Sequence, residues 1–244
     1  MKIAILSSGN LGFKRHVWKR LPEPEIQFDK IEKREKEILS LLRDVFWSHD
    51  VQSLAGGALL HRHYDIPDTA LLVERFQGRR SITKAEEFVP LGARVVPHLW
   101  KLDKDERGNV EAVPMEFIVA DEETPDFEAA ASALIANKPF LSELYDTLDH
   151  LGVLDIIGLQ LVHRDSLRVE GGQLIEMTSH SSSASIITSE SFHDVASVTA
   201  RIVPTFFPFG KMVGEQKADT CSSHGWDFCS RSGNSCCCGS GSDD

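Results

Sequence analysis

Two histidines and an aspartate stand at alternate positions in one short segment, as His61, His63 and Asp65. On an extended strand alternate side chains share a face, so these three side chains are expected to project together. Imidazole nitrogens and carboxylate oxygens in this combination are typical ligands of Zn²⁺ or Fe²⁺. The spacing therefore predicts a divalent metal site with zinc or iron as its cofactor, in which Asp68 is an alternative third ligand and His98 a fourth.

Such a site indicates a metal-dependent enzyme acting on a small molecule, because a bound ion polarises a substrate oxygen or activates a water molecule. The same segment is also compatible with a non-catalytic interaction or scaffold protein. In that case His61 is a hydrogen-bonded residue at a sheet edge, and Arg62 pairs with Glu74 across a hairpin. Convergence of His61, His63 and a third donor within about 2–2.5 Å of one point favours the enzyme. An Arg62–Glu74 pair, with His61 and His63 pointing at solvent or backbone, favours the scaffold.

The segment from Gly56 to Trp100 resembles the two motifs of the cupins in part. The first cupin motif places HxH shortly before a glutamate, and here four residues separate His63 from Asp68. The second motif has the form PxGxxH, and residues 88–92 precede His98 in a roughly similar way. However, the last histidine comes three residues too late, aspartate replaces glutamate, and the chain has more helix than a cupin barrel. No family is assigned from this resemblance.

Composition limits the classes of partner and the location. A net charge of −11 disfavours nucleic acid and anionic membrane as partners, since both would repel the protein. The apolar runs are far shorter than the roughly 20 residues of a transmembrane helix, and the opening apolar core is too short for a secretory signal peptide. Residues 1–220 contain no cysteine. We therefore expect a cytoplasmic protein without a transmembrane segment, and no protein partner is indicated.

Hydrophobic periodicity predicts two long helical segments, over residues 27–47 and 126–151, the second interrupted near Pro139. Strands are predicted at residues 58–64, 70–74, 94–102, 110–120, 154–163, 173–178 and 184–188, with a last apolar stretch over residues 198–209. This order favours an α+β fold, in which a mainly antiparallel sheet of hairpins packs against the two long helical segments.

A shift of 102 positions aligns residues 46–75 with residues 148–177 without a gap. Because two copies are too few to establish a repeat, chance similarity and duplication into two related helix–hairpin halves both remain open. Asp165 stands opposite His63, so the second copy does not repeat the HxH pattern. The aligned identities include Val51/Val153, Gly56/Gly158, His61/His163, Arg62/Arg164, Leu72/Leu174 and Glu74/Glu176.

Residues 214–244 hold all five cysteines among serine, glycine and aspartate. This composition predicts a disordered tail, which could tether or regulate the protein, and the cysteine spacing permits a metal without specifying one. The predicted organisation is an N-terminal strand or arm at 1–25, a single α+β domain at 26–213, and this tail. Metal chemistry inside the domain must therefore use histidines and carboxylates.

Overall fold

The computed structural model describes residues 3–5, 11–120, 126–164, 167, 172–179, 183–191, 202–210 and 219–222. Within these ranges, no helix combines the length and the apolar character that crossing a membrane requires. Much of the predicted tail lies outside the described residues. Residues 219–222 of the predicted tail are described and form a strand.

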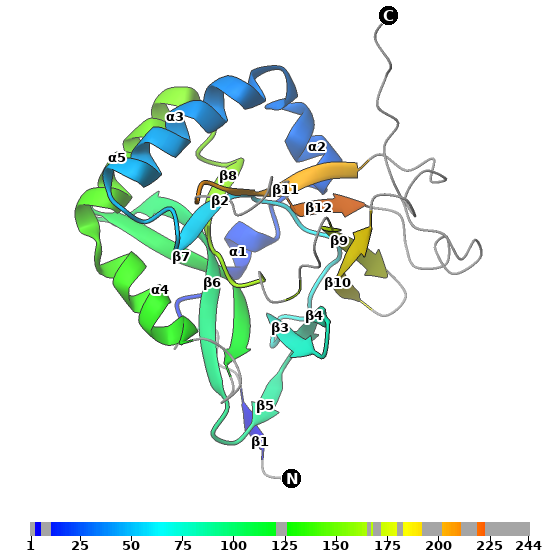
Figure 1. Ribbon diagram of the computed structural model, residues 1–244. Helices are drawn as coiled ribbons and strands as arrows, with labels where there is room; N and C mark the ends of the chain where they lie inside the picture. The colour runs from blue at the N-terminus through cyan, green and yellow to red at the C-terminus, as the bar shows by residue number, and fades with distance from the viewer. Residues whose placement is uncertain are drawn as a thin grey trace, which may run out of the picture.

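One large, curled, mixed sheet forms the body of the molecule (Figure 1). Its strands are β2 (Ala55–Leu59), β3 (Leu71–Gln77), β4 (Arg80–Glu86), β6 (Arg94–Lys104), β7 (Val110–Ala120), β8 (Ile157–Leu161), β9 (Gly172–Ser179), β10 (Ala184–Ser191), β11 (Ile202–Pro208) and β12 (Asp219–Ser222). The sheet closes into a barrel in the order β10-β4-β3-β7-β6-β8-β2-β11-β12-β9. Two further strands, β1 (Ile3–Ile5) and β5 (Phe88–Pro90), form a separate antiparallel pair.

Hairpin neighbours in the barrel are antiparallel, but two parallel pairs join them edge to edge. β3 pairs with β7 in parallel, with Val73 opposite Phe117, and β9 pairs with β12 in parallel, with Glu176 opposite Cys221. These two pairs allow the sheet to close. Closure leaves no free strand edge and gives the sheet an inner face that is shielded from solvent.

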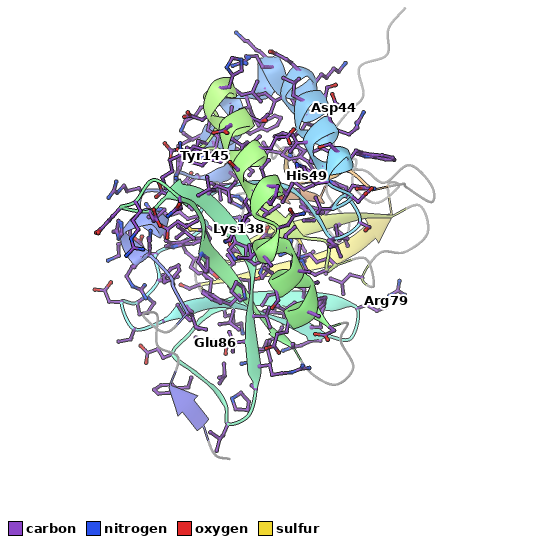
Figure 2. All side chains as sticks on the ribbon, turned by 90° about the vertical axis from the view of Figure 1, so that its left-hand side faces the viewer. Asp44, His49, Arg79, Glu86, Lys138 and Tyr145 are labelled. Atoms are coloured by element: carbon purple, nitrogen blue, oxygen red, sulfur yellow. The ribbon has the colours of Figure 1, made fainter. Side chains whose placement is uncertain are left out.

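The described residues also form five helices and one 3-10 turn. They are α1 (Arg15–Trp18), α2 (Pro24–Asp29), the 3-10 turn η1 (Glu32–Arg34), α3 (Glu35–Ser48), α4 (Phe127–Ala136) and α5 (Lys138–Leu151). Helices α4 and α5 pack on β6 and β7, while α3 packs on α5 (Figure 1). Figure 2 views the α3–α5 pair, with Asp44 labelled on α3, His49 directly after its end, and Lys138 and Tyr145 on α5. The apolar faces of this pair bury Ile38, Leu42, Phe46, Leu141, Leu144 and Leu148.

The predicted α+β fold, with a sheet of hairpins packed against two long helical segments, is wrong. The first predicted helix is broken, because α2 ends at Asp29 and a 3-10 turn precedes α3. The second is divided at Asn137, whose side chain accepts a hydrogen bond from the Phe140 amide at 3.2 Å and so starts a new helix. The hydrophobic pattern of the sequence does not reveal these breaks, because residues on both sides of a break, such as Phe28 and Ile38, enter the same hydrophobic core.

Several predicted strands are present, although their ends differ. The strands expected at 94–102, 110–120, 173–178 and 184–188 lie within β6, β7, β9 and β10. The strand expected over residues 58–64 ends at Leu59, so the histidines follow it in irregular structure. Strand β4 was not predicted, because Arg80–Glu86 is mostly polar and lacks an apolar run.

Residues 102 positions apart occupy matching places in the barrel. Gly57 of β2 pairs with Leu159 of β8, and these two positions are themselves 102 apart, so the β2–β8 pairing is symmetric about this point. The outer neighbours match as well, since Phe207 of β11 pairs with Gly57 and Trp100 of β6 pairs with Leu159. The corresponding strands β2 and β8 therefore pair with each other within one closed sheet.

Candidate functional site: two histidine–carboxylate clusters

The first cluster consists of His61, His63 and Glu176. Each residue offers one ligand atom, and the three atoms lie within 4.8 Å of one another. The two histidines follow β2, and Glu176 lies on β9. The distance from His61 Nε2 to His63 Nε2 is 3.0 Å, and that from His63 Nε2 to Glu176 Oε1 is 3.1 Å. The side chains of His63 and Glu176 are 8% and 13% exposed, so the cluster is largely buried.

The backbone fixes which nitrogen of His61 faces the cluster. Its Nδ1 lies 2.7 Å from the carbonyl oxygen of Leu59. Because a carbonyl oxygen only accepts hydrogen bonds, Nδ1 carries the proton and Nε2 presents a lone pair to the cluster. Burial, with a contribution from nearby His63, lowers the pKa of His61 to about 4. The ring is therefore neutral near pH 7, which is the form that binds metal.

Glu176 supplies the negative charge of the first cluster. Burial alone would raise the pKa of its carboxyl group, but attraction to His63, a hydrogen bond from His63, and the nearby His61 and Arg164 outweigh it. The resulting pKa of Glu176 is about 2. Two imidazoles and one ionised carboxylate therefore face a common point.

The second cluster consists of Glu74 on β3, His98 on β6 and His163, which follows β8. Its side chains are at most 1% exposed. Glu74 Oε2 lies 2.9 Å from His163 Nε2 and 3.3 Å from His98 Nε2. His163 is oriented as His61 is, with Nδ1 at 2.8 Å from the carbonyl oxygen of Leu161. This cluster has the same donor types as the first and is more deeply buried.

An arginine engages the carboxylate of the second cluster. Arg164 donates from Nε to Glu74 Oε1 and from Nη2 to Oε2, each at 2.9 Å, and the Ser81 hydroxyl also donates to Oε1. Burial would raise the pKa of Glu74, but Arg164 and His163 hold it well below its usual range. The matching arginine of the first cluster, Arg62, turns away and pairs with Asp65 at 2.6 Å. Of the two matching arginines, Arg164 therefore engages the carboxylate of its cluster, whereas Arg62 pairs outside the first cluster.

The curvature of the sheet brings these residues together. In the sheet order, β7 and β6 separate β3 from β8, so Glu74 can reach His163 only across the inside of the barrel. The β6–β7 register shifts between Pro97 and Leu99, which places His98 at a bulge. A bulge bends its strand and redirects the side chain, here toward Glu74.

A third carboxylate, Glu116 on β7, lies beside the second cluster, with Oε2 at 3.8 Å from His98 Nε2. Burial raises the pKa of Glu116 to about 7, and the negative charge of Glu176 contributes. Near neutral pH this group is present in both protonated and ionised forms. A carboxyl group with this pKa is suited to general acid–base chemistry.

The structure brings together some of the residues singled out in the sequence and separates others. His61 and His63 meet in the first cluster, and His98 lies in the second. Asp65 and Asp68 are 84% and 78% exposed, and they pair with surface cations. The Arg62–Glu74 pair of the scaffold alternative is absent, because Arg164 occupies Glu74.

Sequence reasoning missed Glu176 and Glu116 as site residues. It also treated Glu74 and His163 only as framework positions. A signal was present, because the shift of 102 positions aligned His61 with His163 and Glu74 with Glu176. The crossing was not foreseeable from it, since each cluster combines a histidine of one copy with the glutamate of the other.

Comparisons with known proteins give no relative for this chain. No protein-family model, curated protein or solved structure matches it. The evidence on function therefore comes from the two clusters.

Proposed function

We propose that this protein is a metal-dependent enzyme acting on a small molecule, and that His61, His63 and Glu176 hold its zinc or iron ion. The observation that carries the proposal is the convergence of their three donor atoms within 4.8 Å of one another. Two imidazoles and one carboxylate form a common ligand set for both metals. Three protein ligands leave coordination positions open for water and substrate.

The protonation states of the cluster support a cation. His61 is neutral and Glu176 is ionised near pH 7, so an ion need displace only the proton that His63 Nε2 donates to Glu176. His61 Nε2 presents its lone pair toward His63 Nε2 at 3.0 Å. Two nitrogens at this distance attract each other only when a proton or a cation lies between them. A divalent ion satisfies both nitrogens and the carboxylate at once.

The first cluster is the better candidate for catalysis because it is the less buried of the two. His63 and Glu176 retain some exposure, whereas the side chains of the second cluster have almost none. The enclosed position excludes large substrates. In this setting the ion would polarise a substrate oxygen or activate water, and Glu116 would give or take a proton.

Metal analysis of purified protein tests the proposal. Cysteine thiolates are common zinc ligands. All proteins therefore carry Cys229→Ser, Cys236→Ser, Cys237→Ser and Cys238→Ser, a set called the serine background, while Cys221 of β12 is retained. After loading with Zn²⁺ or Fe²⁺ and desalting, the unsubstituted cluster should retain metal, measured by mass spectrometry. The His61→Ala/His63→Ala protein should lose the ion of the first cluster.

His49→Ala is the matched control, because His49 pairs with Glu143 at the protein surface at 2.8 Å. Its metal content should equal that of the parent protein. Equal metal content in the parent and the His61→Ala/His63→Ala protein would exclude the proposed site.

A further inference from the structure

We infer that Glu74, His98 and His163 form a second cation site, which takes a divalent transition metal such as Zn²⁺. Their ligand atoms lie within 4.8 Å of one another on the inside of the barrel. Imidazole and carboxylate groups suit this class of ion. The site rests on its own residues and does not depend on whether the first cluster binds metal.

His98 supplies an independent observation that points to a ligand. Its side chain is fully buried, and among the described residues neither ring nitrogen has a hydrogen-bond partner. Nε2 lies 3.3 Å from Glu74 Oε2, but this contact lacks the geometry of a hydrogen bond. Leaving a buried polar group unsatisfied is unfavourable, so such groups call for a partner. A cation between His98 Nε2 and Glu74 provides that partner for one of the two nitrogens.

The contact between His163 and Glu74 is compatible with the same ion. Its Nδ1 faces the Leu161 carbonyl oxygen and therefore carries a proton. In the neutral ring, Nε2 then presents a lone pair to Glu74 Oε2 at 2.9 Å. Two lone pairs at this distance repel unless a proton or a cation separates them. The same oxygen also faces His98, and one metal ion balances all three donors.

The interior charge sets the order in which two ions bind. The two clusters and their neighbours Glu116 and Arg164 contain three carboxyl groups, on Glu74, Glu116 and Glu176. The guanidinium of Arg164 is the one positive group counted among them. With neutral histidines and ionised carboxylates, one divalent ion neutralises this group of charges. A second ion adds excess positive charge, and Arg164 already occupies Glu74. The second site should therefore bind more weakly than the first.

Calorimetric titration of the metal-free protein with Zn²⁺ tests the inference. In the serine background, two binding steps are expected, with two ions per chain at saturation. His98→Leu removes the unsatisfied nitrogens and retains an apolar side chain of suitable size, so the protein should fold. It should lose the weaker step only, while His61→Ala/His63→Ala should lose the tighter step only.

His150→Leu is the matched control, since His150 is exposed on α5 and should leave both steps unchanged. If the parent protein binds one ion per chain and His98→Leu binds it equally well, the second site is overturned and the proposed function stands. One ion that only His98→Leu removes would support the second site and refute the first. If His98→Leu does not fold, a single binding step in the parent protein overturns the inference.

Discussion

His61 and His163 make the same backbone contact at positions 102 residues apart. Each directs Nδ1 to the carbonyl oxygen two residues earlier, at 2.7 Å for His61 and 2.8 Å for His163. In both rings Nε2 then faces a buried cluster that contains a carboxylate. This shared orientation makes each histidine a fixed donor, because a hydrogen bond on the far nitrogen sets the tautomer of a metal ligand.

The first prediction compares the glutamate found in the cluster with the aspartate expected from the sequence. Glu176→Gln should weaken metal binding about tenfold or more, because it replaces the anionic ligand by a neutral amide. Asp65→Asn should leave the affinity unchanged, since Asp65 is 84% exposed and pairs with Arg62. Competition with a chromophoric chelator measures both affinities. A larger loss in Asp65→Asn would return the ligand role to the HxHxD pattern.

The second prediction concerns the pH dependence of stability in the metal-free protein. The pKa of Glu116 is raised from 4.5 to about 7, so folding favours its protonated form. The resulting stabilisation is complete below pH 4.5 and is lost as the pH rises through about 7. By linkage, this shift corresponds to a loss on the order of 3 kcal/mol across that range.

Glu116→Gln removes this titrating group. The free energy of unfolding should therefore differ less between the two ends of that pH range in the variant than in the parent protein. Urea unfolding of both proteins, with chelator present throughout, gives the comparison. The carboxylates whose pKa values are lowered, Glu74 and Glu176, lose stabilisation at acid pH in both proteins and cancel in the difference. Identical pH profiles would contradict a raised pKa for Glu116.

The third prediction concerns two glycines at matching positions. A Cβ atom on Gly56 would lie 2.5 Å from the Phe207 carbonyl oxygen, and one on Gly158 would lie 2.4 Å from the Trp100 carbonyl oxygen. Backbone atoms of a paired strand cannot move aside easily. Gly56→Ala and Gly158→Ala should each destabilise the protein by about 1–3 kcal/mol or more.

Gly57→Ala is the control in the same strand, because its nearest neighbour would be a side-chain atom at an ordinary 3.5 Å. Thermal or urea unfolding should show only a small change for this variant. Similar losses at Gly56 and Gly57 would mean that the close approach of β11 to β2 is not the cause.

The fourth prediction uses the two matching arginines. Arg164→Met leaves Glu74 buried without its guanidinium partner and should cost about 3–5 kcal/mol in the metal-free protein. Arg62→Met breaks a pair with the exposed Asp65 and should cost at most about 1 kcal/mol. Urea unfolding with chelator present measures both changes. Equal costs would show that Glu74 does not rely on Arg164.

The sequence predicted that His61 and His63 would act together, although for an incomplete reason. Strand alternation ends at Leu59, so the two rings converge in the irregular segment after β2, and Asp65 turns outward. Glu176 was missed because its approach to His63 depends on barrel closure through parallel pairs. Local periodicity carries no information about such long-range pairing. Hydrophobic periodicity also predicted two long helices, because core residues continue on both sides of the breaks at residues 30–34 and at Asn137.

Anomalous X-ray diffraction at the zinc absorption edge, from crystals of metal-loaded protein, tests the metal centre most directly. We predict an anomalous peak about 2–2.5 Å from His61 Nε2, His63 Nε2 and a Glu176 carboxylate oxygen. The same map shows whether a second peak lies among Glu74, His98 and His163. Loaded crystals with no anomalous peak between His61, His63 and Glu176 would contradict the proposed metal site.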